Sequence, residues 1–205
     1  MKKITLLIAL LITSLGFSQD LLLGMETGET GGVLGDPFGA MAAPVLEAGT
    51  GTNTSRVLKI VGNTAGEVWQ GINLSLTSSV GLTTTKTMTI DVLSSVPVTF
   101  LMKVNGGVAG AAEAAAQASH NGDGTWQTIS FTFNTSLDGK AAQANGVYNN
   151  MVLHPFFPFS GGPSAQTFYI DNISGPDVSP TLSNFTVPAK LIGDAPFSLT
   201  APTTN

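Results

Sequence analysis

Polar and apolar residues alternate with a period of two along most of this chain. The segments 72–76, 87–92 and 127–133 each place apolar side chains at every second position. Such alternation predicts β-strands that have one face against a core and the other against solvent. Two more strands are expected around Val98–Phe100 and Phe168–Ile170, because β-branched and aromatic residues concentrate there.

Clusters of glycine and asparagine separate these segments. They occur at 61–66, 105–107 and 121–124 and predict turns. Several short strands divided by turns indicate an all-β fold, an antiparallel β-sandwich. The alanine-rich segment 109–119 has helix-forming residues but no apolar stripe, so we expect a loop that runs into a small-residue strand at 114–120.

The two ends of the chain differ from this pattern. Residues 1–19 begin with Met-Lys-Lys, continue as an apolar stretch and end in small residues, which predicts a secretory signal peptide that is too short to span a membrane. A single domain is then expected at 20–176, followed by a linker at 177–180. Alternation restarts at 181–205, which predicts the first strands of a second, truncated module of a longer protein, secreted or held at the cell surface.

The composition restricts both the source of stability and the partners. The chain has no cysteine, so a secreted domain must be stabilised by its core, by a metal ion or by both. Without the two lysines of the signal peptide, six of the eight basic residues remain against 13 acidic ones. This balance argues against nucleic acids and anionic membranes, while the many neutral polar side chains suit a neutral ligand such as a polysaccharide.

No catalytic motif is present in the sequence. There are two histidines, and the chain lacks a Gly-x-Ser-x-Gly elbow, a His-Glu-x-x-His pair and a phosphate-binding glycine loop with lysine. Glycoside hydrolysis needs two carboxylates across the scissile bond, and the acidic residues here are scattered singly. The sequence therefore predicts that these residues are not an enzyme.

Both tryptophans fall on the polar faces of predicted strands. Aromatic rings in such positions can stack on the apolar faces of sugars while nearby polar side chains bind the hydroxyl groups. Each tryptophan also lies at the start of its strand, where it can instead pack under a loop. The candidate ligand-binding residues are Trp69, Asn73, Asp91, Lys103, Trp126 and His154.

The segment 151–163 is rich in phenylalanine and proline. Pro155 and Pro158 predict that a strand ends there and a loop begins. The phenylalanines of this loop either frame a binding edge or close one end of the sandwich as a hydrophobic lid.

The order of several segments resembles a known family. "MET", "NTSRVLKI", "EVWQGINLSL", "TMTIDVLSS", "TWQTISFTF" and "TFYIDNI" resemble segments of secreted jelly-roll carbohydrate-binding modules of the galactose-binding-like type, particularly those of marine Bacteroidetes. The resemblance covers about residues 20–176 and implies a jelly roll that binds a polysaccharide, β-glucan or another marine glycan, without catalysis. Residues 181–205 resemble the opening of a bacterial immunoglobulin-like repeat.

The resemblance also implies a structural calcium ion. In such modules a glutamate of the first strand and an aspartate of the last strand hold Ca²⁺ together with backbone carbonyls. Glu26 and Asp171 match these two positions, and the carbonyls are expected near 53–55. The alternatives for Asp171 are a solvated residue at a strand end and a cap of the following turn.

Two other functions remain open at this point. One is a structural or adhesive spacer in a multidomain protein, without a sugar site. The other is delivery of an enzyme that lies in a missing C-terminal part of the protein.

Overall fold

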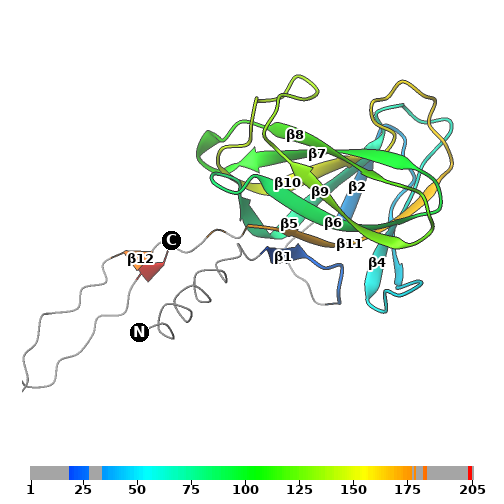
Figure 1. Ribbon diagram of the computed structural model, residues 1–205, viewed down its shortest axis with the longest axis horizontal. Coiled ribbons are helices and arrows are strands. Elements are labelled where there is room, and N and C mark those ends of the chain that lie inside the picture. Colours follow the sequence, from blue (N-terminus) through cyan, green and yellow to red (C-terminus); the bar gives the residue numbers. More distant parts are fainter. Residues whose placement is uncertain (1–18, 28–33, 177, 179–181, 184–202, 205) are drawn as a thin grey trace, which may run out of the picture.

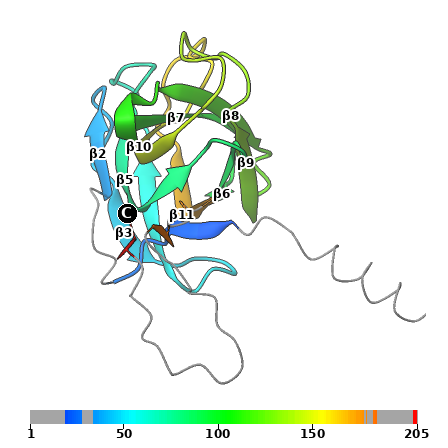
Figure 2. The same ribbon diagram turned by 90° about the vertical axis from the view of Figure 1, so that its left-hand side faces the viewer.

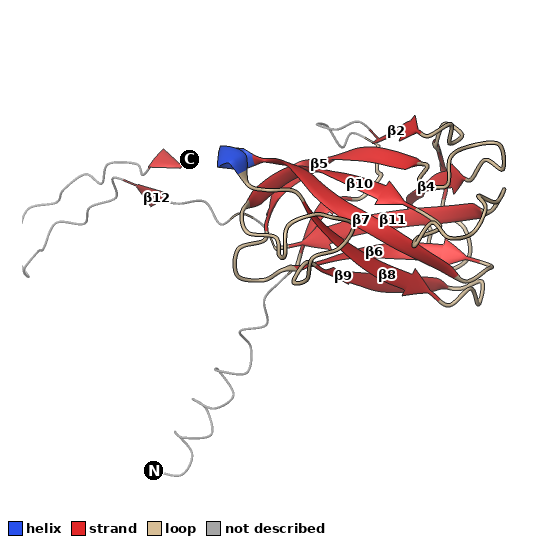
Figure 3. Cartoon of the chain, turned by 90° about the horizontal axis from the view of Figure 1, so that it is seen from above, coloured by secondary structure: helices blue, strands red, loops and turns tan. Residues whose placement is uncertain are grey.

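The computed structural model describes residues 19–27, 34–176, 178, 182–183 and 203–204 (Figure 1). Within residues 20–175, two antiparallel β-sheets face each other across one core, as the end-on view shows (Figure 2). Loops gather at both ends of the strands, and a short 3₁₀ turn is the only helical element among the described residues (Figure 3). The predicted all-β jelly-roll sandwich is thereby confirmed.

The first sheet, here sheet A, contains six strands. They are β1 (Asp20–Leu23), β3 (Val45–Ala48), β4 (Arg56–Val61), β6 (Thr87–Ser94), β9 (Trp126–Thr132) and β11 (Thr167–Gly175). Their order is β3-β4-β11-β6-β9, and β1 pairs with β11. Strands from both ends of the domain therefore lie side by side.

The second sheet, here sheet B, contains five strands. They are β2 (Leu34–Phe38), β5 (Gly71–Gly81), β7 (Val98–Gly107), β8 (Ala114–His120) and β10 (Val147–His154), and the 3₁₀ turn η1 (Val108–Gly110) joins β7 to β8. Their order is β2-β5-β10-β7-β8.

The period-two alternation explains which side chains enter the core. In β9 and just after it, Ile129, Phe131 and Phe133 are buried as predicted, while Ser130 and Thr132 between them are exposed. In β5 the buried residues include Ile72 and Leu74. Alternation is required because successive side chains of a strand point to opposite faces of its sheet.

The alanine-rich segment behaves as predicted. It forms η1 and a loop, and then β8 at 114–120. Ala114 and Ala116 are buried in the core, and β8 pairs with β7 along its whole length. Pairing with a neighbouring strand overrides the helix propensity of alanine, because propensity is a weak local preference.

The prediction of a turn at 105–107 is wrong, because β7 continues through these residues. Asn105 pairs with Asn150 of β10, and Gly107 pairs with Tyr148. Gly106 between them has φ +63°, a left-handed conformation that glycine adopts without strain. The glycines therefore bend the strand instead of ending it.

The strand expected at 168–170 is also longer than predicted. It continues to Gly175 as a central strand of sheet A, with an irregular register between Asp171 and Ser174. Asn172 lies within this irregularity and has φ +47°. Asp171 is thus inside a strand and not at its end.

The predicted ends of the chain lie mostly outside the described residues. Of the predicted signal peptide only Gln19 is described, and of the predicted linker at 177–180 only Val178 is described. In the tail, β12 (Leu182–Ser183) pairs with β13 (Thr203–Thr204). The signal peptide, the linker and the truncated module stay predictions. No helix among the described residues is long and apolar enough to cross a membrane.

Candidate functional site

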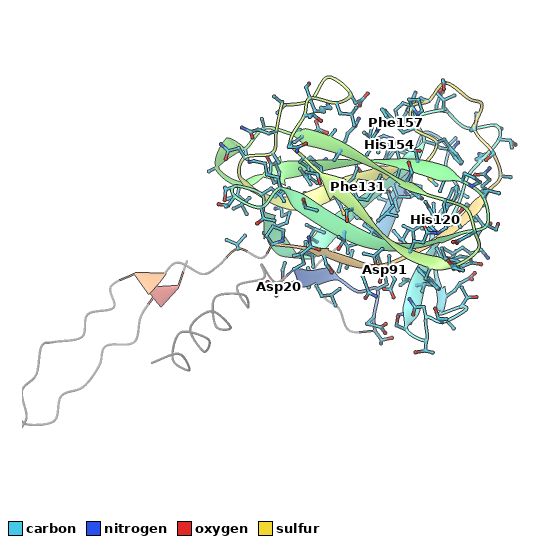
Figure 4. The ribbon with its side chains drawn as sticks, in the orientation of Figure 1. Asp20, Asp91, His120, Phe131, His154 and Phe157 are labelled. Atoms are coloured by element: carbon cyan, nitrogen blue, oxygen red, sulfur yellow. The ribbon has the colours of Figure 1, made fainter. Side chains whose placement is uncertain are left out.

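The structure divides the six candidate ligand-binding residues between the two outer faces of the sandwich. Asn73, Lys103 and His154 belong to sheet B, and Trp69 lies in the turn before β5. Asp91 and Trp126 face outward from sheet A. Figure 4 shows His154 and Asp91 well separated on the two sides of the molecule.

Five aromatic rings form a continuous cluster at one end of sheet B, here called the aromatic ridge. The ridge consists of Phe38, Trp69, His154, Phe157 and Phe159. Phe38 stacks on Trp69 with ring centroids 6.1 Å apart and planes 16° apart, and its edge meets His154 at 5.1 Å. Phe159 contacts both His154 at 5.6 Å and Phe157 at 5.1 Å.

A rigid turn presents Trp69 at the end of this ridge. Gln70 is fully buried, and its side-chain amide accepts a hydrogen bond from the N–H of Asn63 and donates to the carbonyls of Asn63 and Glu67. The carbonyl of Trp69 accepts a hydrogen bond of 2.8 Å from Nδ1 of His154. Trp69 is nevertheless 46% exposed, so its backbone is held in place while much of its surface is free to meet a ligand.

Polar side chains of three strands extend from the ridge along the outer face of sheet B. Asn73 and Lys103 flank Val152 in one cross-strand row, and Asn150 of β10 lies between Ser75 and Asn105 in the next. A hollow of about 240 Å³ is lined by Asp36, Asn73, Leu74, Ser75, Asn105, Asn150 and Met151.

Two of the amide side chains in this hollow differ in their hydrogen bonds. Asn73 donates through Nδ2 to the carbonyl of Asp36 at 3.2 Å. Oδ1 of Asn105 is buried and has no hydrogen-bond partner among the described residues. Buried polar atoms normally have a partner. This oxygen is covered by the protein itself, so it is not one of the groups of the hollow that a ligand can reach.

Lys103 is less available to a ligand than the sequence suggested. Its ammonium group lies 2.6 Å from Oδ2 of Asp138, and its side chain is only 15% exposed. Asp138 belongs to the long connection between β9 and β10, which therefore reaches over this face of sheet B. Lys103 holds that connection in place by an ion pair.

The sequence suggested that His154 lies on a solvent-exposed face, but its side chain is buried. It points outward from β10 but is only 5% exposed, because the rings of Phe38 and Phe159 cover it. Burial lowers the pKa of His154, and the charge of Lys103 acts in the same direction. The hydrogen bond to the carbonyl of Trp69 and the carboxylates of Asp138 and Glu113 oppose this effect.

The lowered pKa of His154 predicts a loss of stability in mild acid. Between the folded-state pKa and the ordinary value of 6.5, the unfolded chain binds a proton that the folded chain does not. This contribution to stability is complete above about pH 6.5 and decreases as the pH falls below it. We expect the midpoint of thermal unfolding to fall by a few degrees between pH 7.5 and pH 5.5.

The variant His154→Gln is the control for this pH effect, since glutamine can still donate to the carbonyl of Trp69 but does not titrate. Its melting temperature should depend less on pH than that of the wild type. Equal pH dependence of the two proteins would show that His154 does not cause the change.

On sheet A, Trp126 and Asp91 are both held by protein contacts. The indole N–H of Trp126 donates to the carbonyl of Thr50 at 2.8 Å, and the ring lies over Gly51. Asp91 accepts hydrogen bonds from the hydroxyl of Thr128 and from Nδ2 of Asn172. These contacts fit the alternative in which Trp126 packs against a loop.

The loop at 49–55 covers the outer face of sheet A at Asp171. Oδ2 of Asp171 accepts hydrogen bonds of 2.7 Å from Nδ2 of Asn53 and from the hydroxyl of Ser55. Oδ1 accepts only from the N–H of Asn172. The carboxyl group is fully buried, so the alternative of a solvated Asp171 is wrong.

Several oxygen atoms lie around this loop. No ion pair among the described residues includes Asp171, although a buried carboxylate normally needs a cationic partner. Oε1 of Glu26 accepts from the N–H of Arg56, at the end of the same loop. A Cβ on Gly49 would collide with the carbonyl oxygens of Asn53 and Ser55, so both carbonyls converge there.

The two carboxylates, the carbonyls and the side-chain oxygens are the kind of ligands that Ca²⁺ prefers. No three His, Cys, Asp or Glu side chains of the described residues form a metal-binding group, so backbone and neutral oxygens would have to complete the shell.

Sequence reasoning missed several residues of the sheet B face. Phe38 follows Pro37 in a strand with no alternation, so nothing in the pattern marked it as a ring beside Trp69. The outward position of Asn150 could have been inferred, because it directly precedes the apolar Met151, whose side chain points into the core.

Comparisons with known proteins support the fold. No protein-family model and no curated protein matches the chain. Among solved structures, a family 11 carbohydrate-binding module from Clostridium thermocellum, in complex with a β-1,3-1,4-mixed-linked tetrasaccharide, is similar with a TM-score of 0.50. The two share 13% sequence identity over 78% of this chain and 96% of that chain.

Two further solved structures are also similar. The xylan-binding domain of family 22 from Paenibacillus barcinonensis shares 16% identity over 77% of this chain and 97% of that chain, with a TM-score of 0.44. A protein of a xyloglucan utilization locus in Bacteroides uniformis shares 12% identity over 76% of this chain and 49% of that chain, with a TM-score of 0.45. An origin in marine Bacteroidetes stays a prediction.

Proposed function

We propose that residues 20–176 form a secreted, non-catalytic module that binds a neutral polysaccharide on the outer face of sheet B. The observation that carries this proposal is the exposed ring of Trp69, at the end of a sheet face that also carries a polar hollow. Rigid aromatic surface next to hydrogen-bonding groups is what sugar recognition requires.

In this proposal the parts of the face have different roles. A sugar ring stacks on Trp69, which Phe38 supports from behind. Hydroxyl groups farther along the chain of sugars meet the amides of Asn73 and Asn150 in the hollow. Lys103 and His154 support the site: Lys103 fixes the β9–β10 connection, and His154 fixes Trp69.

The charge of the molecule favours a neutral glycan such as a β-glucan. The chain carries a formal net charge of −5, and the lysine on this face is paired with Asp138. An acidic polysaccharide would meet an unfavourable field and no free cation in the proposed site.

We also propose that a calcium ion stabilises the module at the opposite sheet. Glu26 and Asp171 would hold it, together with the carbonyls of Asn53 and Ser55. A bound divalent cation would neutralise the buried carboxylate of Asp171 and tie the last strand to the 49–55 loop and to Glu26. Glu26 lies just after β1, which ends at Leu23, and not within the first strand as expected.

The variant Trp69→Ala tests the proposed site. Truncation of an aromatic residue at the centre of a binding site costs about 2 kcal/mol or more, so binding to a soluble β-glucan should weaken about thirtyfold or more. The melting temperature should change by no more than about 2 °C, since the side chain is largely exposed. Affinity electrophoresis and differential scanning calorimetry provide the two measurements.

Two variants control this experiment. Trp69→Phe keeps a ring and should retain part of the affinity, while Leu21→Ala removes an exposed apolar side chain of sheet A and should change nothing. Unchanged retention of Trp69→Ala would contradict the proposal. A large drop in its melting temperature would make Trp69 a packing residue.

A further inference from the structure

The outer face of sheet A carries a second row of large side chains. Tyr169 of β11 lies opposite Lys59 on one side and Leu93 on the other, and Leu93 lies opposite Trp126. Directly opposed residues of neighbouring antiparallel strands point to the same face. The neighbours of Tyr169 in its strand, Phe168 and Ile170, are fully buried in the core, so Tyr169 and the rest of this row face outward.

We call Lys59, Tyr169, Leu93 and Trp126 the sheet A row. The three apolar members are all partly exposed. The hydroxyl of Tyr169 has no hydrogen-bond partner within the described part of the chain. Lys59 forms an ion pair of 3.0 Å with Glu47, which neutralises the one cation of the row. The row is thus a partly apolar strip with no unbalanced charge.

The two aromatic rings of the row have a spacing that suits an extended glycan. Tyr169 and Trp126 are separated by β6, which is two strand spacings, or about 9.6 Å. This is close to the length of two sugar units in an extended β-linked chain. Every second sugar of such a chain presents the same face, so two successive equivalent sugars can each meet a ring.

Polar hollows lie on both sides of the row. One of about 350 Å³ is lined by Trp126, Asp91, Asn172 and residues 52–55. The other, of about 310 Å³, is lined by Lys59, Leu93, Tyr169 and the small polar residues Ser94, Ser95 and Thr167 together with Gly124. Hydroxyl groups at the edges of a sugar ring stacked on the row would find hydrogen-bonding partners in both hollows.

The backbone holds the row in a fixed geometry. Tyr169, Leu93 and Trp126 belong to three consecutive strands of sheet A, and the indole of Trp126 is anchored by its hydrogen bond to the carbonyl of Thr50. A preorganised surface loses little conformational entropy when a ligand binds.

We propose that the sheet A row is a second carbohydrate-binding site, which takes an extended, neutral, β-1,4-linked glycan lying across the strands. It is separate from the site of Trp69, which belongs to the opposite sheet, and it does not depend on that site. If both sites bind, one module bridges two glycan chains or binds one long chain with increased avidity.

The test measures binding of soluble hydroxyethylcellulose and of cellohexaose by isothermal titration calorimetry. In a Trp69→Ala background, the hexasaccharide should still bind, and a further Tyr169→Ser substitution should reduce that affinity at least tenfold. Leu93→Lys, which places a charge in the middle of the row, should act like Tyr169→Ser. Ser130→Lys, on the same outer face but in β9 away from the row, should leave binding unchanged.

The outcomes separate this proposal from the function proposed above. Complete loss of binding in Trp69→Ala alone would overturn the second site and leave the first intact. Loss of binding in Tyr169→Ser or Leu93→Lys, with no effect of Trp69→Ala, would support the second site and contradict the first. No binding by the wild type to either cellulose ligand would overturn the second site, while the function proposed above would be contradicted only by absence of binding to every neutral polysaccharide. Melting curves establish which variants are folded, and Leu93→Lys replaces Tyr169→Ser if that variant unfolds.

Discussion

Adding a calcium chelator should lower the melting temperature of the domain by roughly 8–16 °C relative to a calcium-saturated sample. A ligand present at about a thousand times its Kd stabilises the folded state by about 4 kcal/mol. Each kcal/mol shifts the midpoint by about 2–4 °C in a domain of this size. The expected source is the buried carboxylate of Asp171, which has no cationic partner among the described side chains.

The variant Asp171→Asn identifies the ligand in this experiment. It keeps the size of the side chain but removes the negative charge, so its melting temperature should be low and should not respond to the chelator. Glu113→Gln, which removes a carboxylate from a surface ion pair with Lys140, should respond like the wild type. A wild type that melts at the same temperature with and without chelator would contradict the calcium proposal. A normal response of Asp171→Asn would exclude Asp171 as a ligand.

Replacing Phe168 with alanine should lower the free energy of unfolding by about 3–5 kcal/mol. Phe168 is fully buried in β11, a central strand of sheet A, and its ring meets Phe100 of sheet B at 5.4 Å and Phe156 at 5.6 Å. The substitution opens a cavity between the two sheets and removes contact with the loop after β10.

Chemical denaturation measures this loss as a shift of the midpoint at constant slope. The neighbouring variant Tyr169→Phe is the matched control, because its ring faces outward and it should lose less than about 1 kcal/mol. A loss below about 1 kcal/mol for Phe168→Ala would show that the two sheets are not packed around this ring.

Much of the fold follows from the sequence because burial of one sheet face imposes a period of two. That pattern predicted the inward positions of Ile129, Phe131 and Phe133. It also distinguished the β8 strand from a helix, since the alanine-rich segment has no stripe of apolar residues with helical spacing. These are local properties of each segment.

Features that depend on distant contacts could not be predicted in this way. Asn105–Gly107 has the composition of a turn, but pairing with β10 keeps it in a strand. Asp171 has the sequence context of a strand end. It is covered by the 49–55 loop, whose Asn53 binds it across a separation of 118 residues in the chain.

The candidate ligand residues illustrate the same limit. Alternation correctly indicates the side of a strand on which Lys103 and His154 lie, but it contains no information on what covers that side. It also does not reveal which sheet a strand joins. Trp69 and Trp126 look equivalent in the sequence, and only the structure shows that they lie at opposite faces of the sandwich.

The central claim is that this domain binds a polysaccharide, in contrast to a spacer with no sugar site. The most direct measurement is binding of the intact chain, in calcium-containing buffer, to an array of neutral and acidic polysaccharides. We predict saturable binding to at least one neutral β-linked glycan, with weaker or no binding to acidic ones. Absence of binding to every polysaccharide at millimolar protein concentration would contradict the account and favour the spacer.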